Sequence, residues 1–281
     1  MRLTKNIKPC YYIVNKNQSA TGESRNTMNL LFIGDVVGRS GLDFIRSNLY
    51  RIKKEYNIDF TVANGENSAP GNGISKASAD ELTEYGVDVI TTGNHAFRRK
   101  EAAGIFEQSH ILRPANYPDG CVGKGYGIYD FGRYSIAVVN LMGTAFMESL
   151  DNPFSCIDRI LKEIDTPNII VDFHAEATSE KKAMGHYLTG KVSAVLGTHT
   201  HVQTADEIIL GGHTGYITDA GMTGPELSVL GVNSEDAINK QKYKTPVCFR
   251  ESENPSFLNA VVLEIDTKLG ICTKINRLVI R

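Results

Sequence analysis

The stretch Val192-Ser-Ala-Val-Leu-Gly-Thr-His-Thr-His-Val202 gives the strongest indication of both the fold and the chemistry of this chain. Its apolar first half has the length and composition of a buried β-strand. Two histidines one residue apart, His199 and His201, follow that strand directly. Because neutral imidazole is a common metal ligand, a pair of imidazoles at one strand end predicts part of a metal site.

Four other apolar runs are followed in the same way by side chains that can bind a metal ion through oxygen or nitrogen. Those side chains are Asp35, Glu66 with Asn67, Asn94 with His95, and His174. Taken singly, such an aspartate is usually a turn or capping residue and such a histidine is usually structural. Five matched placements favour a shared site, because the carboxyl ends of strands in an open α/β sheet meet at one crevice. Oxygen and nitrogen ligands without cysteine suit Mn, Fe or Zn.

The alternation of apolar runs and amphipathic stretches predicts the fold class. The first half has a βαβ rhythm typical of a parallel sheet, with strands at 29–34, 59–63 and 87–92 and helices at 40–56, 76–85 and 98–108. The second half predicts two hairpins, 127–131 with 134–140 and 257–265 with 271–280. Further strands are expected at 168–173, 192–196, 206–210 and 215–219. So many strands favour two stacked sheets with helices outside.

Composition places the chain among globular proteins with a sizeable core. It has 281 residues, of which 41% are hydrophobic and 22% charged, and its formal net charge is −2. That charge predicts no strong attraction to nucleic acid or to an anionic membrane. No apolar run approaches the roughly 18 residues of a membrane span. The 5 cysteines are odd in number and lack C-x-x-C spacing, which indicates free thiols and favours the cytoplasm.

Residues 1–27 differ from the rest of the chain because they are polar and basic. Their longest apolar run, Cys10–Val14, is shorter than the roughly 7–15 residues of a signal-peptide core. We expect a flexible extension over residues 1–27 and a single domain over residues 28–281, since no linker or repeat follows.

Gly93-Asn94-His95 and the His199-x-His201 pair resemble two motifs of the calcineurin-like metallophosphoesterases, in the same order along the chain. Two departures stand out. Asp35-Val36-Val37-Gly38 lacks the histidine of the first motif in those enzymes, and Gly65-Glu66-Asn67 replaces their Gly-Asp.

In both departures the chain resembles one bacterial branch of these enzymes, the YmdB-type 2′,3′-cyclic-nucleotide phosphodiesterases. Two further stretches support this resemblance, Val171-Asp-Phe-His-Ala-Glu176 and Tyr216-Ile-Thr-Asp-Ala-Gly-Met-Thr-Gly-Pro225. The similarity runs from Met28 to the C-terminus. It implies an α/β fold in which two mixed β-sheets form an αββα sandwich flanked by helices.

The resemblance also implies a set of ligands for two transition-metal ions, Fe or Mn first and Zn or Mg as alternatives. Glu66 would bridge the two ions. Asp35, Asn67 and His201 would bind one ion, and Asn94, His174 and His199 the other. His95 would be the general acid, for which an ordinary imidazole titrating near pH 6.5 is suitable. The alternative for His95 is a hydrogen bond that only orients Asn94.

The activity implied is hydrolysis of 2′,3′-cyclic nucleotides to nucleoside monophosphates, by attack of a hydroxide that bridges the metals. A phosphomonoesterase, a nuclease acting on RNA ends, and a metal-dependent regulatory or scaffold protein remain alternatives. The expected partner is a small cyclic nucleotide or related phosphodiester, and a homo-oligomer is left open. No other cofactor is expected.

Two smaller features have competing interpretations. Asp172 and Glu176, which flank His174, either support the ligands from behind or cap a turn or helix. For Gly71-Asn72-Gly73, a turn with positive φ angles is favoured over a phosphate-binding loop.

Overall fold

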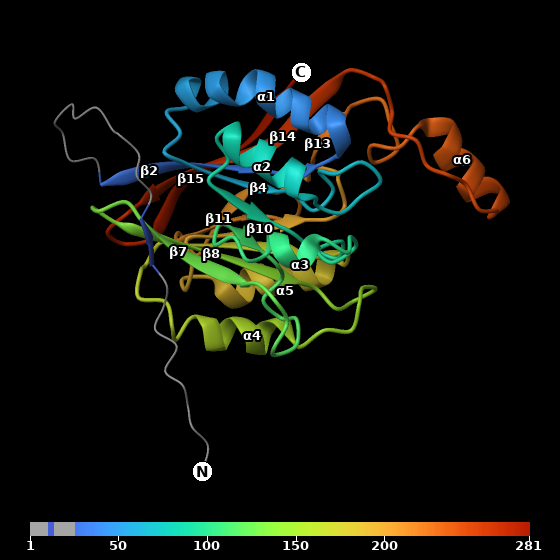
Figure 1. The fold of residues 1–281 in the computed structure, drawn as a ribbon. Helices are drawn as coiled ribbons and strands as arrows, with labels where there is room; N and C mark the ends of the chain where they lie inside the picture. The colour runs from blue at the N-terminus through green and yellow to red at the C-terminus, as the bar shows by residue number, and fades with distance from the viewer. Residues whose placement is uncertain (1–10, 14–25) are drawn as a thin grey trace, which may run out of the picture.

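Two β-sheets are stacked face to face, and helices cover their outer faces (Figure 1). The structure is a computed structural model that describes residues 11–13 and 26–281. The αββα sandwich predicted from the sequence is confirmed. None of the helices in the described part has the length and apolar content needed to cross a membrane.

The first sheet has the strand order β3-β13-β14-β2-β4-β5-β6, and β15 pairs with β14. Its strands are β2 (Thr27–Ile33), β3 (Asp35–Val36), β4 (Phe60–Asn64), β5 (Val89–Thr91), β6 (Ile111–Leu112), β13 (Met222–Pro225), β14 (Ser256–Asp266) and β15 (Ile271–Ile280). Strands β2, β4, β5 and β6 run parallel to one another, whereas β14 is antiparallel to β2 and β15. The predicted hairpin near the C-terminus is therefore confirmed.

The second sheet has the order β1-β7-β8-β9-β10-β12-β11. Its strands are β1 (Tyr11–Ile13), β7 (Tyr126–Asp130), β8 (Ser135–Met142), β9 (Ile169–His174), β10 (Ala194–Thr198), β11 (Ile208–Leu210) and β12 (Thr214–Ile217). Strands β8, β9, β10 and β12 are parallel. Strand β1 pairs with the edge strand β7. Within the extension predicted over residues 1–27, residues 1–10 and 14–25 lie outside the described residues.

Three apolar layers hold the sandwich together. Helices α1 (Gly38–Glu55), α2 (Lys76–Glu84) and α3 (Ala102–Ile105) cover the first sheet, and α4 (Pro153–Ile160) and α5 (Thr178–Leu188) cover the second. Helix α1 buries Leu42, Ile45, Leu49 and Ile52, whose spacing of three and four residues places them on one face. Between the sheets, side chains such as Phe32, Val138 and Leu196 form the central layer.

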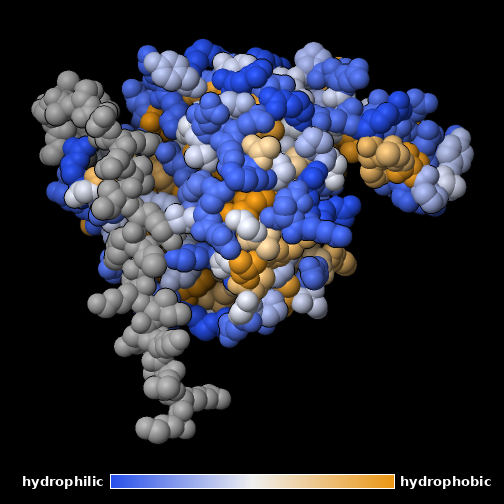
Figure 2. All heavy atoms as spheres, viewed as in Figure 1, coloured by the Kyte–Doolittle hydropathy of each residue, from blue (hydrophilic) through white to orange (hydrophobic). Residues whose placement is uncertain are grey.

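Helix α6 (Ser234–Tyr243) projects from the body of the molecule (Figure 1). Figure 2 shows a mainly hydrophilic surface over α1 and α2, with apolar side chains gathered on the projecting segment. Ile238 on α6 is among the exposed apolar residues.

The helix predicted over 98–108 is wrong in extent, because α3 contains only Ala102–Ile105. Residues before it form turns, and the Arg99 guanidinium donates hydrogen bonds to the backbone carbonyls of Pro70 and Asn72. These contacts fix the segment to a neighbouring loop. Gly104 also weakens a longer helix.

The parallel order of the strands determines where the site forms. In the first sheet β2, β4 and β5 end next to Asp35, Glu66 and Asn94, and in the second sheet β9 and β10 end at His174 and next to His199. All of these strand ends lie at the carboxyl edge, so side chains from both sheets meet there.

Candidate metal centre

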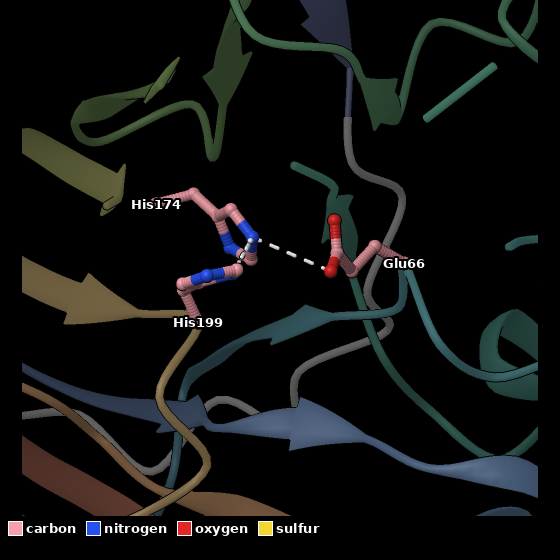
Figure 3. Close-up of side chains that lie close together, drawn as sticks. All are labelled: Glu66, His174 and His199. Atoms are coloured by element: carbon pink, nitrogen blue, oxygen red, sulfur yellow. Dashed lines mark hydrogen bonds and ion pairs between the residues drawn. The ribbon is translucent and has the colours of Figure 1, made fainter. Parts of the chain in front are cut away.

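Three of the predicted ligands lie within reach of one ion. Ligand atoms of Glu66, His174 and His199 are all within 4.8 Å of one another (Figure 3). Figure 3 shows the two imidazole rings and the carboxylate pointing toward one another from three different strand ends. Glu66 and His174 are buried.

One series of contacts links Glu66 to Asn67, His201 and Asp35. The Asn67 amide donates to Glu66 Oε1 at 3.1 Å, and its nitrogen lies 3.3 Å from His201 Nε2. His201 Nε2 is 3.8 Å from Asp35 Oδ1. These contacts bring together oxygen and nitrogen atoms from three strand ends.

A second series of contacts links Glu66 to His174, Asn94 and His199. His174 Nε2 is 3.3 Å from Glu66 Oε1, 2.9 Å from Asn94 Oδ1 and 3.0 Å from His199 Nδ1. Gly93 lets His174 approach this closely, because a Cβ at Gly93 would collide with the His174 ring. The seven predicted ligands thus lie in one connected set of contacts, in which Asn67 and His174 contact Glu66 directly.

Burial and the charges of neighbouring side chains both shift the pKa values of the predicted ligands. Burial by itself would raise the pKa of Glu66, but attraction and a hydrogen bond from His174, followed by His95, hold that pKa well below its usual value. Burial raises the pKa of Asp35 despite attraction from His201 and His174. Burial, with repulsion from His174, lowers the pKa of His199 to about 3, so its ring is a neutral donor of a lone pair.

The donor set fits divalent cations. Asp35 Oδ1 is fully buried and has no hydrogen-bond partner among the described residues, although buried carboxylate oxygens are normally satisfied. His174 Nε2 and His199 Nδ1 also lie 3.0 Å apart, and when neither nitrogen carries a proton, both present a lone pair that needs a partner. A metal ion bound between these atoms would satisfy them, as oxygen and imidazole ligands suit Mn, Fe or Zn.

His95 lies against the same carboxylate. Its backbone N–H donates to Glu66 Oε2 at 3.1 Å, and its Nδ1 is 2.9 Å from Asn67 Oδ1. Its side chain is 24% exposed, so His95 combines contact with the predicted ligands and access to solvent.

The backbone around His199 and His201 is strained and needs support. Both residues have positive φ angles, 104° and 63°, which are uncommon for residues other than glycine. Asp219 accepts a hydrogen bond from Thr200 N at 3.0 Å and from Lys181 Nζ at 2.6 Å. Lys181 also donates to the Thr198 carbonyl at 2.7 Å. The buried Lys181–Asp219 pair therefore fixes the loop that carries both histidines.

We predict that Lys181→Met lowers the free energy of unfolding by about 3–5 kcal/mol, because it leaves the Asp219 carboxylate buried without its charge partner. Denaturant unfolding measures this loss. The matched control is Lys182→Met at the next residue. The Lys182 side chain is 52% exposed, so its ion pair with Asp206 should contribute at most about 1 kcal/mol to the free energy of unfolding. Equal losses in the two variants would show that the buried pair has no special role.

Asp172 supports His174 from behind. His174 Nδ1 lies 2.9 Å from Thr198 Oγ1, and that hydroxyl donates to Asp172 at 2.7 Å. Burial raises the pKa of Asp172 to about 6, although the charge of His174 opposes this. Glu176 contacts His199 Nε2 at 3.1 Å. Neither acidic residue caps α5, whose N-cap is Ala177, so the helix-capping alternative is wrong.

Gly71-Asn72-Gly73 forms the expected turn. Its three φ angles are 75°, 71° and 82°, so the positive-φ interpretation is confirmed.

Sequence reasoning missed Lys181, Thr198 and Asp219 as parts of the site. Asp219 lies inside the quoted stretch Tyr216–Pro225, which was the available signal. Its role as a carboxylate partner of Lys181 depends on a contact between residues 38 positions apart.

Two stacked mixed sheets with Asp, Glu, Asn and His side chains at one edge define a hydrolase of the metallophosphoesterase class. Within that class, the chain belongs to the YmdB-like protein family, which it matches over residues 31–278.

Similar proteins and similar solved structures support the assignment of the chain to this family. A 2′,3′-cyclic-nucleotide 2′-phosphodiesterase of Bacillus subtilis is 44% identical over 256 residues, covering 90% of this chain and 97% of the relative. A crystal structure of a hypothetical protein from Thermus thermophilus has a TM-score of 0.85 at 41% identity, covering 90% of this chain and 98% of that one. The structure of a novel phosphatase from Mycoplasma pneumoniae has a TM-score of 0.86 at 34% identity, covering 90% of this chain and 93% of that one.

Proposed function

We propose that this chain is a dinuclear-metal phosphodiesterase that hydrolyses 2′,3′-cyclic nucleotides to nucleoside monophosphates. The observation that carries the proposal is the position of Glu66, whose Oε1 lies 3.1 Å from the Asn67 amide nitrogen and 3.3 Å from His174 Nε2. A carboxylate between two groups of ligands is suited to bridging two cations. The B. subtilis relative supports the choice of substrate through its name.

The ligands divide into two groups around that carboxylate. Asp35, Asn67 and His201 would hold one ion, and Asn94, His174 and His199 the other. Iron or manganese is the proposed metal. Divalent ions at such a centre supply a nucleophilic water at neutral pH and neutralise charge on the phosphoryl group.

The protein residues determine orientation and proton transfer. Asn67 holds Nδ1 of His95, so Nε2 is the nitrogen that gives a proton to the departing ribose oxygen when the bond from phosphorus to that oxygen breaks. Asp172, through Thr198, fixes the ring of His174, and Lys181 with Asp219 fixes the loop carrying His199 and His201. Two divalent ions, two carboxylates and one hydroxide leave a single positive charge, which suits a monoanionic phosphodiester.

The substrate is proposed to be a small molecule in the cytoplasm. Cys121, Cys156, Cys248 and Cys272 are free thiols, which supports a reducing compartment. The formal net charge of −2 favours a small phosphodiester over a long nucleic acid.

A substrate panel tests the proposal. Purified protein supplied with Mn²⁺ or Fe²⁺ is assayed on 2′,3′-cyclic AMP, 3′,5′-cyclic AMP, an RNA dinucleotide and 3′-AMP. We expect 2′,3′-cyclic AMP to be hydrolysed fastest and a chelator to abolish its turnover. Faster release of phosphate from 3′-AMP would instead identify a phosphomonoesterase, and no turnover with any substrate would favour a scaffold.

A further inference from the structure

Phe146 is an aromatic side chain in a conformation that folding alone does not explain. Its ring is 91% exposed, the highest exposure among the large apolar residues of the described part. Its φ angle is 63°, in the left-handed region that a bulky residue rarely adopts. Strained residues of this kind occur at functional sites, and His199 and His201 are among the other residues with positive φ, together with Asn57, Asn72, Leu230 and Lys244.

The loop that carries Phe146 is held firmly beside the metal centre. Gly143 N donates to the carbonyl of His174 at 2.9 Å. Glu180 of α5 accepts hydrogen bonds from Thr144 N at 2.9 Å and Ala145 N at 3.3 Å. These bonds fix the backbone up to the residue before Phe146, so the exposed ring is presented from a defined position.

The distance along the chain places the ring within reach of a bound nucleotide. Met142 is the register partner of His174, so Gly143 begins at the carboxyl edge of the second sheet. Phe146 is the third residue after Gly143, so their Cα atoms are at most about 11 Å apart. In Figure 1 the connection from β8 to α4 extends on the side of the molecule from which α6 projects.

We propose that Phe146 is the platform on which the nucleobase of the substrate stacks while its phosphate lies at the metal centre. This inference rests on the proposed function and names the feature of the substrate that the enzyme recognises. A phenyl ring offers a π-face and no hydrogen-bonding group. Stacking on it accepts every base, because all bases have a π-face. The enzyme should therefore discriminate weakly among the four bases and strongly against phosphodiesters without a base.

A tryptophan probe tests the stacking without turnover. The chain contains no tryptophan, so Phe146→Trp introduces a single tryptophan at the proposed position, whose fluorescence can be excited selectively. We expect 3′-AMP with Mn²⁺ to quench this fluorescence, and ribose 3-phosphate with Mn²⁺ to leave it nearly unchanged. The matched control is Tyr50→Trp on α1, a site 70% exposed, which neither compound should quench. Equal quenching by the two compounds, or none by 3′-AMP, overturns the proposal.

Kinetics of a second set of variants separate stacking from a structural role. Phe146→Ala should raise KM for 2′,3′-cyclic nucleotides by about 10-fold to 100-fold, leave kcat nearly unchanged, and spare the base-free diester methyl p-nitrophenyl phosphate. Phe146→Tyr should retain the wild-type KM. Leu269→Ala, at the exposed β14–β15 turn, is the control. Equal losses on both substrates overturn the stacking role. Quenching of Phe146→Trp in an enzyme that does not hydrolyse cyclic nucleotides would sink the proposed function and uphold the stacking.

Discussion

Replacing Glu66 by alanine should release most of the bound metal and slow hydrolysis of 2′,3′-cyclic AMP by at least about 10²–10³-fold, as expected on loss of a central charge-stabilising group. The reason is the place of Glu66 in the site. Its Oε1 contacts both Asn67 and His174, so the substitution removes the carboxylate that joins the two groups of ligands.

Elemental analysis and initial rates on the same preparation measure both effects. Glu176→Ala is the matched control, because that carboxylate also contacts a proposed ligand, His199, but is half exposed. It should weaken metal affinity or activity by about 10–100-fold at most, the range for groups that orient a ligand. Retention of two ions per chain in Glu66→Ala would reject the bridging role.

Replacing His95 by alanine should keep both ions and the fold while slowing hydrolysis of the cyclic nucleotide by about 10²–10⁴-fold, the usual contribution of a positioned acid. The backbone N–H of His95, which donates to Glu66 Oε2, remains in the variant. The loss should be much smaller for a p-nitrophenyl ester, because nitrophenolate leaves without needing a proton.

His95→Gln separates proton transfer from orientation. Its amide can still donate to Asn67 Oδ1, the contact that Nδ1 makes in the wild type, but it cannot supply an acidic proton. If His95 only orients the ligands, glutamine should restore activity. If His95 is the acid, glutamine should be as slow as alanine with the metal content unchanged. Loss of metal in both variants would favour the orienting role.

The sequence was enough to predict the layers and the location of the site. Residues such as Glu66 and His199 directly follow apolar runs, and the topology of a parallel sheet brings such positions to one edge. The amphipathic stretch after the first strand likewise predicted a helix over 40–56, which the structure contains as α1. These signals are local, since each depends on residues within a few positions of one another.

What could not be predicted depends on contacts between distant segments. The sequence 98–108 has helical character, but Arg99 bonds to the carbonyls of Pro70 and Asn72, and only four residues form α3. Lys181 looks like an ordinary surface lysine on a helix until the fold buries it against Asp219. Phe146 has no local signal for the role proposed for it, because its loop is held by hydrogen bonds to the distant residue Glu180.

The central claim is that Glu66 and the six ligands gathered about it bind two metal ions that are needed for hydrolysis. Titration of Mn²⁺ into chelator-treated protein, with bound metal and 2′,3′-cyclic AMP hydrolysis followed on the same samples, tests it directly. Binding should saturate at two ions per chain, and full activity should require the second ion. Saturation at one ion with full activity, or full activity of protein that binds no metal, would contradict it.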